Sequence, residues 1–299
     1  MTIITEQRNP DTVNIDLMSS VEIARAINRE DQKVALAVEK VLANIAQGID
    51  LMANAFLNGG RVAYFGAGTS GRIGVLDASE WVPTFSADEG MVKAYIAGGD
   101  KVLRYSVENA EDSAEFALRD LEDFAPTNKD VVVGISASGN PQYVITVLEE
   151  AQKRGAKTIG ITSNPKAGFA PYCDELICVG VGQEAITGSS RMKSGTAQKM
   201  VLNMLSTGAM IRIGKTYQNY MIDVKVSNKK LYKRGLRFIS EICDVNETEA
   251  EKLLNESGNS VKTACVMKLK NCSRKEAKKM LSGAGGILRK VISRQVSRS

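Results

Sequence analysis

The chain has 299 residues, of which 43% are hydrophobic, and it carries a formal net charge of +5 without a single histidine. The absence of histidine excludes Ser-His-Asp and Cys-His catalysis, so any acid/base chemistry must use carboxylates, lysine, tyrosine or cysteine. A transition-metal site would need an unusual shell of carboxylates or thiolates. Carboxylates are therefore the first candidates for catalysis.

The N-terminus and the cysteines indicate a cytoplasmic protein. The first 20 residues lack the basic region and apolar run of an export signal, and no later run has the length of a membrane span. The five cysteines are scattered and show no CxxC spacing. This pattern predicts neither a disulfide framework nor a zinc site. We expect a soluble cytoplasmic protein with reduced thiols and no membrane partner.

Charge is distributed unevenly along the chain. From residue 225 to the end there are 18 Lys and Arg against 7 Asp and Glu, whereas the preceding part is net negative. The basic residues alternate with apolar residues at helical spacing, and no aromatic platform or recognition motif for nucleic acid accompanies them. A solvated basic face explains this pattern better than a nucleic-acid site does, so we expect no nucleic-acid partner.

The first predicted elements are helices followed by a strand. Apolar residues recur at helical spacing from about residue 20 to 58, where Asn-Gly-Gly ends the run, so we expect one or two N-terminal helices. The segment 61–81, RVAYFGAGTSGRIGVLDASEW, then predicts a strand, a glycine-rich loop and a helix. This helix should end near Trp81, because Pro83 disfavours helical backbone at the preceding residue.

The unit of strand, loop and helix recurs further along the chain. It appears in residues 130–155 and, shortened, in 156–164, and another apolar run, ELICVGV, covers 175–181. Short buried strands that alternate with helices indicate a parallel sheet with helices on both faces. The last junction, TGSSRMKSGTAQ at 187–198, leads into an apolar helix. The predicted fold class is α/β.

After Tyr220 the chain becomes lysine-rich, and no further strand-like run occurs. A final apolar piece, ILRKVISRQV, follows three short amphipathic segments at 247–256, 260–269 and 274–281. Their helical spacing predicts a small helical bundle of a size that barely folds alone.

Three loops that follow predicted strands and open helices combine glycine with hydroxyl residues: GAGTSG at 66–71, SASGN at 136–140 and TGSS at 187–190. Free N–H groups and the helix dipole make such a junction an anion site, so a phosphate is the expected ligand. One such loop alone is often only a helix cap. GAGTSG also matches GxGxxG, but the acidic residue expected after the next strand of a dinucleotide fold has no counterpart, so we expect neither NAD nor FAD.

The motifs GAGTSGRIGVLDASE, ENAEDS, SASGNPQYV and TGSSRMKSGTAQK resemble those of the N-acetylmuramic acid 6-phosphate etherase family, which has the sugar isomerase (SIS) fold and is related to the glucokinase regulatory protein. The resemblance extends from about residue 20 to 291. It implies an SIS-type parallel sheet flanked by helices, with a phosphosugar-binding domain at 1–225. A helical region at 226–299 is expected to contain a UBA-like three-helix bundle at about 240–292.

The resemblance also implies an activity, namely cleavage of the D-lactyl ether at C3 of N-acetylmuramic acid 6-phosphate to N-acetylglucosamine 6-phosphate and D-lactate, in amino-sugar catabolism and cell-wall recycling. No cofactor is implied, and the protein is expected to be a homodimer with sites near the subunit interface. In the open-chain aldehyde a base removes the acidic C2 proton, an acid protonates the departing lactate oxygen, and water then adds. Two carboxyl groups suffice for this chemistry.

The family motifs place the proton donor at Glu80, in DASE, and a second active glutamate, the base, at Glu111, in ENAED. We expect Glu80 at the C-terminal end of a helix beside Trp81, where the dipole and desolvation favour a protonated carboxyl. We expect Glu111 in the first turn of a helix that begins near Asn109, where the charged form is favoured. Without the motifs, both would pass for ordinary surface glutamates.

The expected substrate-binding residues lie in the three loops and just after them: Gly68, Thr69, Ser70, Gly71, Arg72, Ser136, Ser138, Gly139, Asn140, Thr187, Ser189, Arg191 and Lys193. The three cations among them are sensible partners for phosphate or sugar, although solvated salt bridges explain them nearly as well. Asp77, one turn before Glu80, is expected to be a surface or supporting group rather than a third catalyst.

Two other functions fit the same residues. A phosphosugar aldose–ketose isomerase would also use a glutamate at C2 and the same phosphate loops, and release of lactate distinguishes the two. A phosphosugar-sensing regulatory protein would need only the binding loops. The N-terminal helices show no clear helix-turn-helix, and Glu80 and Glu111 argue against a pure sensor, although a binding-only relative could keep them.

Overall fold

The computed structural model describes residues 4–105, 107, 109–224, 226 and 228–293. The chain divides into two compact units. The first consists of Met1–Ser79 and Gly90–Thr207, and the second of Glu80–Glu89 and Gly208–Ser299. Lys225, where we place the domain boundary from the sequence, lies outside the described residues, and that boundary stays a prediction.

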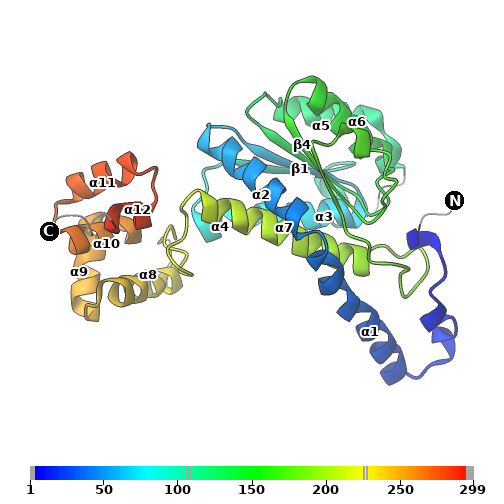
Figure 1. The fold of residues 1–299 in the computed structure, drawn as a ribbon, viewed down its shortest axis with the longest axis horizontal. Helices are drawn as coiled ribbons and strands as arrows, with labels where there is room; N and C mark the ends of the chain where they lie inside the picture. Colours follow the sequence, from blue (N-terminus) through cyan, green and yellow to red (C-terminus); the bar gives the residue numbers. More distant parts are fainter. Residues whose placement is uncertain (1–3, 106, 108, 225, 227, 294–299) are drawn as a thin grey trace. The chain divides into compact units, whose positions relative to one another are not determined.

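The first unit contains a five-stranded parallel sheet with the strand order β2-β1-β3-β4-β5 (Figure 1). Its strands are β1 (Val62–Gly66), β2 (Val92–Ile96), β3 (Val131–Ile135), β4 (Lys157–Thr162) and β5 (Glu175–Cys178). Every residue of β1 and β3 is buried, as expected for short apolar runs in a sheet that is covered on both faces. The predicted α/β fold is confirmed.

Helices surround this sheet. They are α1 (Ser20–Glu39), α2 (Leu42–Leu57), α3 (Gly68–Ser79), α5 (Ala114–Phe124), α6 (Gln142–Lys153) and most of α7 (Lys193–Arg212). Short 3-10 turns precede α1 or lie between the later elements: η1 (Ile4–Glu6), η2 (Pro10–Thr12), η3 (Ile15–Leu17), η4 (Asp100–Leu103), η5 (Ala110–Asp112) and η6 (Ala170–Tyr172). The two N-terminal helices lie where the sequence predicts them.

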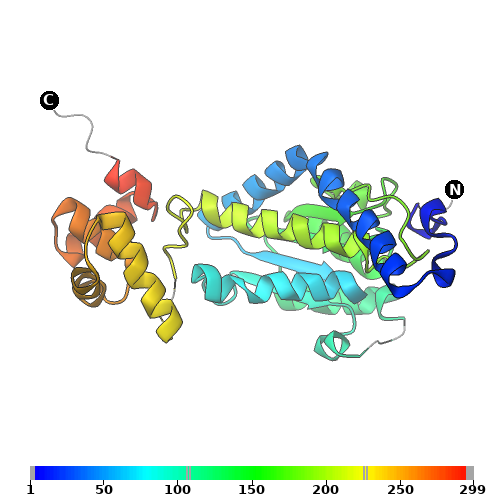
Figure 2. The same ribbon diagram turned by 90° about the horizontal axis from the view of Figure 1, so that it is seen from below.

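Alternate side chains of the strands point to opposite faces of the sheet. Phe65 and Val132 belong to a core that includes Leu121 of α5 and Leu148 of α6, and these two helices cover one face of the sheet (Figure 1). Tyr64 points to the other face, where a Cβ on Gly74 of α3 would meet it at 3.4 Å. The helices α2 and α7 cover the same face as α3 (Figure 2).

The strand β2 and the helix α4 (Trp81–Phe85) depart from the sequence prediction. The residues of β2 show no buried apolar run, and the sequence did not predict this edge strand. The helix α3 ends at Ser79, close to the predicted end near Trp81, but the reason given from Pro83 is wrong, because Val82 and Pro83 lie in the first turn of α4. Proline is tolerated there, since a first-turn N–H has no partner within the helix.

The second unit contains α4 and a helical bundle formed by α8 (Lys229–Cys243), α9 (Glu247–Ser257), α10 (Val261–Lys270), α11 (Arg274–Gly283) and α12 (Leu288–Ile292). Side chains cap the first four helices of this bundle: Asn228, Asn246, Ser260 and Ser273 each accept a hydrogen bond from a first-turn N–H. These caps explain why α9, α10 and α11 begin within a residue of the predicted segments. No helix in the described part of the chain has both the length and the apolar character of a bilayer span.

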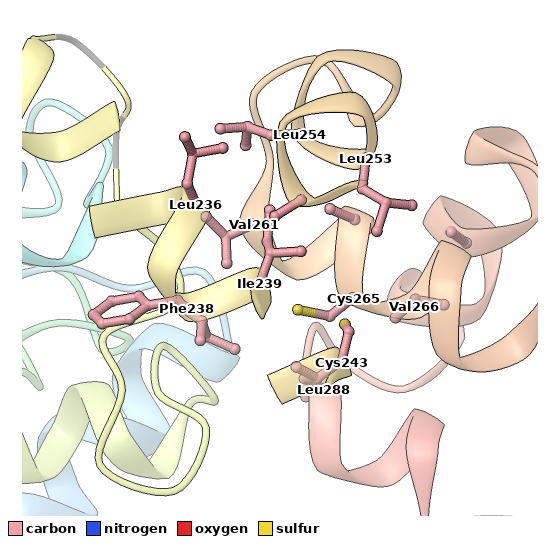
Figure 3. Close-up of a cluster of buried hydrophobic side chains, with 14 of the residues drawn as sticks. Leu236, Phe238, Ile239, Cys243, Leu253, Leu254, Val261, Cys265, Val266 and Leu288 are labelled. Carbon is pink, nitrogen blue, oxygen red and sulfur yellow. The ribbon is translucent and has the colours of Figure 1, made fainter. Parts of the chain in front are cut away.

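The bundle has a hydrophobic core of its own (Figure 3). Leu236 and Ile239 of α8 pack with Leu254 of α9 in this core. Cys243 and Cys265 also lie there, and their thiols hydrogen-bond to each other. This hydrogen bond, together with burial, raises the pKa of Cys265. All five cysteines of the chain are free thiols.

Candidate active site

The first candidate loop joins β1 to α3. A Cβ on Gly66 would lie 2.7 Å from the backbone nitrogen of Gly71, so the start of α3 approaches the end of β1 too closely for a side chain there. Gly68 begins the helix with φ +53°, a conformation that glycine adopts without strain. The loop thus presents the first-turn N–H groups of α3, those of Gly68, Thr69 and Ser70, at the carboxyl edge of the sheet.

A cavity of about 230 Å³ lies beside this loop. It is lined by Gly68, Arg72 and Glu111, together with Asn109 and apolar residues that include Val102. Two of the predicted substrate-binding residues, Gly68 and Arg72, therefore meet one of the two predicted catalytic glutamates in one cavity of the first unit. A mostly apolar lining with a few polar groups is typical of small-molecule sites.

Arg72 is held in place by backbone carbonyl groups of η4. Its Nε donates a hydrogen bond to the carbonyl of Leu103 at 3.3 Å, and its Nη2 donates to that of Val102 at 2.7 Å. Arg72 forms no ion pair with any residue that the structure describes. Because carbonyl groups are neutral, the positive charge of the half-buried guanidinium is not compensated by these contacts.

Glu111 lies in the 3-10 turn η5, and its side chain is exposed. Among the described residues it has no hydrogen-bond or ion-pair partner. The predicted helix start near Asn109 is confirmed only as this single 3-10 turn, because the α-helix α5 begins later, where Ser113 accepts a hydrogen bond from the N–H of Phe116. The helix-dipole argument for Glu111 therefore does not apply, because three residues of 3-10 helix carry little dipole.

Glu80 occupies the turn between α3 and α4, and it is exposed. It follows the last residue of α3 and stands at the N-cap position of α4, so the two helix ends act on it in opposite directions. Trp81 is buried in the protein and does not remove Glu80 from solvent. The predicted position of Glu80 at the end of a helix is confirmed, but the predicted shielding by Trp81 is wrong. Glu80 belongs to the second unit and Glu111 to the first.

Asp77 supports the helix α3 from its inner side. One carboxylate oxygen accepts a hydrogen bond from the hydroxyl of Tyr64 on β1 at 3.0 Å, and the other accepts one from the hydroxyl of Ser206 on α7 at 3.0 Å. Both contacts lie within the first unit. Asp77 thus connects the last turn of α3 to the sheet and to α7. These contacts agree with a supporting role, one of the two roles that the sequence leaves open.

The second candidate loop, residues 136–140, joins β3 to α6. The hydroxyl of Ser136 accepts a hydrogen bond from the N–H of Gly139 at 3.0 Å, and the hydroxyl of Ser138 accepts one from Asn140 at 3.3 Å. Gly139 has φ +73°, and a Cβ there would meet Ala167 at 2.2 Å. The loop is thereby fixed while each hydroxyl keeps its proton for donation to a ligand. Since β3 neighbours β1, this loop and the β1–α3 loop share one edge of the sheet.

The third candidate loop precedes α7, and an internal carboxylate occupies the start of that helix. Fully buried Glu184 accepts hydrogen bonds from the N–H of Lys193 at 2.9 Å and from the N–H and hydroxyl of Ser194, both at 3.0 Å. The N-terminus of α7 is therefore not free for a phosphate. Thr187 and Arg191 are exposed and Ser189 is half-buried.

The side chain of Lys193 points into the protein rather than toward a ligand. Its ammonium group lies 2.5 Å from the carboxylate of Glu30 on α1, and both side chains are buried. The sequence predicts that Lys193 contacts the phosphosugar, whereas in the structure its charge is paired with that of Glu30. Neither Glu184 nor Glu30 was a candidate from the sequence, because nothing in the local pattern distinguishes a buried glutamate from an exposed one.

Comparisons with known proteins identify the family. The model of the glucokinase regulatory protein N-terminal SIS domain matches residues 44–152, that of the SIS domain matches 103–208, and that of the C-terminal lid domain of glucokinase regulatory protein matches 218–257. The N-acetylmuramic acid 6-phosphate etherase of Actinobacillus pleuropneumoniae is 48% identical over 97% of this chain and 95% of its own length. That of Rhizobium rhizogenes is 49% identical over the same shares.

The chain belongs to the N-acetylmuramic acid 6-phosphate etherase family. N-acetylmuramic acid 6-phosphate etherase 2 of Vibrio cholerae is also similar, with 49% identity over 97% of this chain and 94% of its own. These matches to etherases confirm the resemblance that the four motifs indicated, and they include the C-terminal helices.

Solved structures support the SIS fold of the first unit. A phosphoheptose isomerase from Francisella tularensis aligns with a TM-score of 0.50 at 17% identity, over 65% of this chain and all of its own. A phosphoheptose isomerase from Neisseria gonorrhoeae aligns with a TM-score of 0.50 at 21% identity, over 64% of this chain and 98% of its own. At this level of identity, the similarity to these isomerases shows a common fold alone.

Proposed function

We propose that this protein cleaves the D-lactyl ether of N-acetylmuramic acid 6-phosphate, giving N-acetylglucosamine 6-phosphate and D-lactate. Relatives that carry the etherase name at 48% identity over 97% of the chain support this activity. The observation that carries the proposal is the cavity of the first unit, in which Glu111 meets Arg72 at the carboxyl edge of the sheet. Ligands of open α/β sheets bind at this edge.

The proposed reaction is an elimination followed by addition of water. Glu111 takes the C2 proton of the open-chain aldehyde, the C2–H electron pair forms the C2=C3 double bond, and the C3–O bond breaks. Glu80 gives its proton to the departing ether oxygen, which leaves as the hydroxyl of lactate. Water then adds its oxygen to C3 and a proton returns to C2, so one water is consumed. The motifs DASE and ENAEDS support this division of roles.

We assign the phosphate of the substrate to residues 136–140. The hydroxyls of Ser136 and Ser138 each keep a proton to donate, and the loop opens α6, a helix of 12 residues. The third loop is a weaker candidate because Glu184 already caps α7. Ser136→Ala should therefore raise KM for the phosphosugar with a smaller effect on kcat, whereas Ser189→Ala should change KM less.

We further propose that the enzyme is a cytoplasmic homodimer that acts without a cofactor in amino-sugar catabolism and cell-wall recycling. The family membership supports the metabolic role. The mass of one chain is 32.3 kDa. Light scattering, which measures the oligomeric state, should give twice this mass.

One experiment separates the etherase from its two rivals. Purified protein is incubated with N-acetylmuramic acid 6-phosphate, and D-lactate is followed with a coupled dehydrogenase while N-acetylglucosamine 6-phosphate is followed by chromatography. The etherase releases both products in equal amounts. An isomerase would convert an aldose phosphate to a ketose phosphate without lactate, and a sensor would bind the phosphosugar without turnover. Either of those outcomes would reject the proposal.

A further inference from the structure

We propose that Arg72 recognises the lactyl carboxylate of the substrate and thereby sets the preference of the enzyme for a lactyl ether. This inference rests on the proposed function. From the sequence alone, Arg72 could equally well bind the phosphate. The structure favours the lactyl carboxylate instead.

Arg72 and Glu111 share one cavity. Arg72 on α3 and Glu111 in η5 line the same space of about 230 Å³. The remaining walls include the apolar residues Ala97, Val102 and Ala110. In such surroundings an ionic contact is stronger than in bulk water, because the effective dielectric constant is lower. Any anionic group of a ligand that enters this cavity beside Glu111 is therefore stabilised by the positive charge of Arg72.

The connectivity of the substrate decides which anion that is. Glu111 must reach the hydrogen on C2. The carboxylate carbon of the lactyl group is four bonds from C2, along C3, the ether oxygen and the lactyl Cα. The phosphorus atom is six bonds from C2 along the open chain, through C3, C4, C5, C6 and the ester oxygen. When C2 faces Glu111 in a cavity of this size, the nearer anion is the lactyl carboxylate.

The loop of residues 136–140 offers a separate place for the phosphate. It follows β3, the strand next to β1, and it provides the hydroxyls of Ser136 and Ser138. A substrate with two anions thus meets two distinct polar sites along one edge of the sheet. The cavity that contains the base takes the anion attached at C3, and the serine loop takes the anion attached at C6.

The contacts of Arg72 suit it for this role. Its Nε and Nη2 donate to the carbonyl groups of Leu103 and Val102, which fixes the plane of the guanidinium group. Within the described ranges, no residue is a hydrogen-bond partner of its Nη1 and no carboxylate forms an ion pair with it. A pre-oriented donor loses little side-chain entropy when it binds a ligand. The free nitrogen can donate to a carboxylate oxygen.

The test compares two ethers. The substrates are N-acetylmuramic acid 6-phosphate and the 3-O-ethyl ether of N-acetylglucosamine 6-phosphate, which lacks only the carboxylate. Arg72→Met should lower kcat/KM for the lactyl ether about 10- to 100-fold, the range for a hydrogen bond to a charged group, and should change kcat/KM for the ethyl ether much less. Arg72→Lys, which keeps a cation, should retain part of the preference.

A control arginine is available next to the carbonyl groups that Arg72 contacts. Arg104 follows η4 and is exposed, and it does not line the cavity. Arg104→Met should leave the ratio of the two kcat/KM values unchanged. Circular dichroism shows whether Arg72→Met is folded. If it is not, Arg72→Lys provides the test, because it changes the positions of the nitrogen donors. A ratio of kcat/KM for the lactyl ether to kcat/KM for the ethyl ether that equals the wild-type ratio would then overturn the inference.

Two results would overturn the inference with Arg72→Met. An equal loss on both ethers would mean that Arg72 stabilises the reacting carbons or only the fold. A weaker inhibition by N-acetylglucosamine 6-phosphate, which has the phosphate but no lactyl group, would mean that Arg72 binds the phosphate. Should the wild type release no lactate, the proposed function is rejected, and calorimetry still decides this inference, since Arg72→Met must weaken binding of the muramic acid phosphate alone.

Discussion

The ammonium group of Lys193 lies 2.5 Å from a carboxylate oxygen of Glu30, and both side chains are buried. This ion pair connects the middle of α1 with the first residue of α7, and Glu30 also accepts a hydrogen bond from Lys33. Removal of one partner from a buried pair leaves an uncompensated charge in the interior. Removal of either partner should therefore destabilise the fold more than removal of one partner of a surface salt bridge would.

Glu30→Gln should lower the free energy of unfolding by about 3 kcal/mol at pH 7, because Lys193 then keeps a buried charge with no carboxylate opposite it. Urea denaturation followed by circular dichroism measures this difference. The control is Glu39→Gln, an exposed glutamate on the same helix, which should change stability by less than about 0.5 kcal/mol. Equal effects of the two substitutions would contradict the structure.

The contribution of Glu30 should depend on pH. Burial opposes ionisation of this carboxyl, but hydrogen bonds and charge interactions from Lys193 and Lys33 outweigh burial and lower its pKa below the ordinary 4.5. A group whose pKa is lower in the folded state stabilises the fold above its unfolded pKa and loses that contribution as the pH falls. The stability gap between wild type and Glu30→Gln should stay constant above about pH 5.5 and shrink below about pH 4.5. A difference in the free energy of unfolding that stays constant down to pH 3 would contradict a lowered pKa of Glu30.

Glu184→Ala should destabilise the start of α7. The substitution leaves two N–H groups and the hydroxyl of Ser194 without their buried acceptor, at a cost of about 2 kcal/mol in the free energy of unfolding. Hydrogen exchange measured by mass spectrometry should show faster exchange in the first turn of α7. Glu39→Ala provides the exposed comparison. Unchanged protection in that turn would show that Glu184 does not cap the helix.

Asp77→Asn tests whether the end of α3 must be held for catalysis. The carboxylate accepts hydrogen bonds from Tyr64 and Ser206, and an amide can accept with only one of its two terminal atoms. We expect kcat for lactate release to fall on the order of 10-fold, because small displacements of a reacting group are costly, while KM changes little. Ser79→Ala, an exposed change in the same turn, should leave kcat intact. A purely structural role would lower stability without lowering kcat.

The two glutamates should fail in different ways. Glu80→Gln should still exchange the C2 proton of the substrate with deuterium from solvent, because the base Glu111 remains, but it should release little lactate. Glu111→Gln should neither exchange the proton nor release lactate. Proton NMR in deuterium oxide follows the exchange, and a coupled assay follows lactate. Lost exchange in the first variant together with retained exchange in the second would reverse the assignment.

The sequence predicts those parts of the fold that rest on continuous apolar runs. The strands β1 and β3 are such runs, and both are buried throughout. The strand β2 is missed because it contains Lys93 and Tyr95 and lies at the sheet edge. Its stability comes from tertiary contacts: Tyr95 stacks on Phe65 with a centroid distance of 4.7 Å, and its hydroxyl donates to Asp123. No local pattern encodes either contact.

The candidate site was predictable only in part, for the same reason. The glycine-rich turn after β1 follows from its residues, and the family motifs indicate Glu80 and Glu111. The meeting of Arg72 and Glu111 in one cavity depends on how η4 and η5 pack against α3, which the sequence does not encode locally. Likewise, Lys193 looks like a substrate-binding cation in its motif, and only the fold brings Glu30 to it.

The most direct test of the proposed reaction is the fate of solvent oxygen. The wild-type protein is incubated with N-acetylmuramic acid 6-phosphate in water enriched in oxygen-18, and both products are analysed by mass spectrometry. Elimination followed by hydration predicts a labelled oxygen at the C3 hydroxyl of N-acetylglucosamine 6-phosphate and unlabelled D-lactate, because the ether oxygen leaves with the lactate. Label in the lactate, or no lactate above background, would contradict the account.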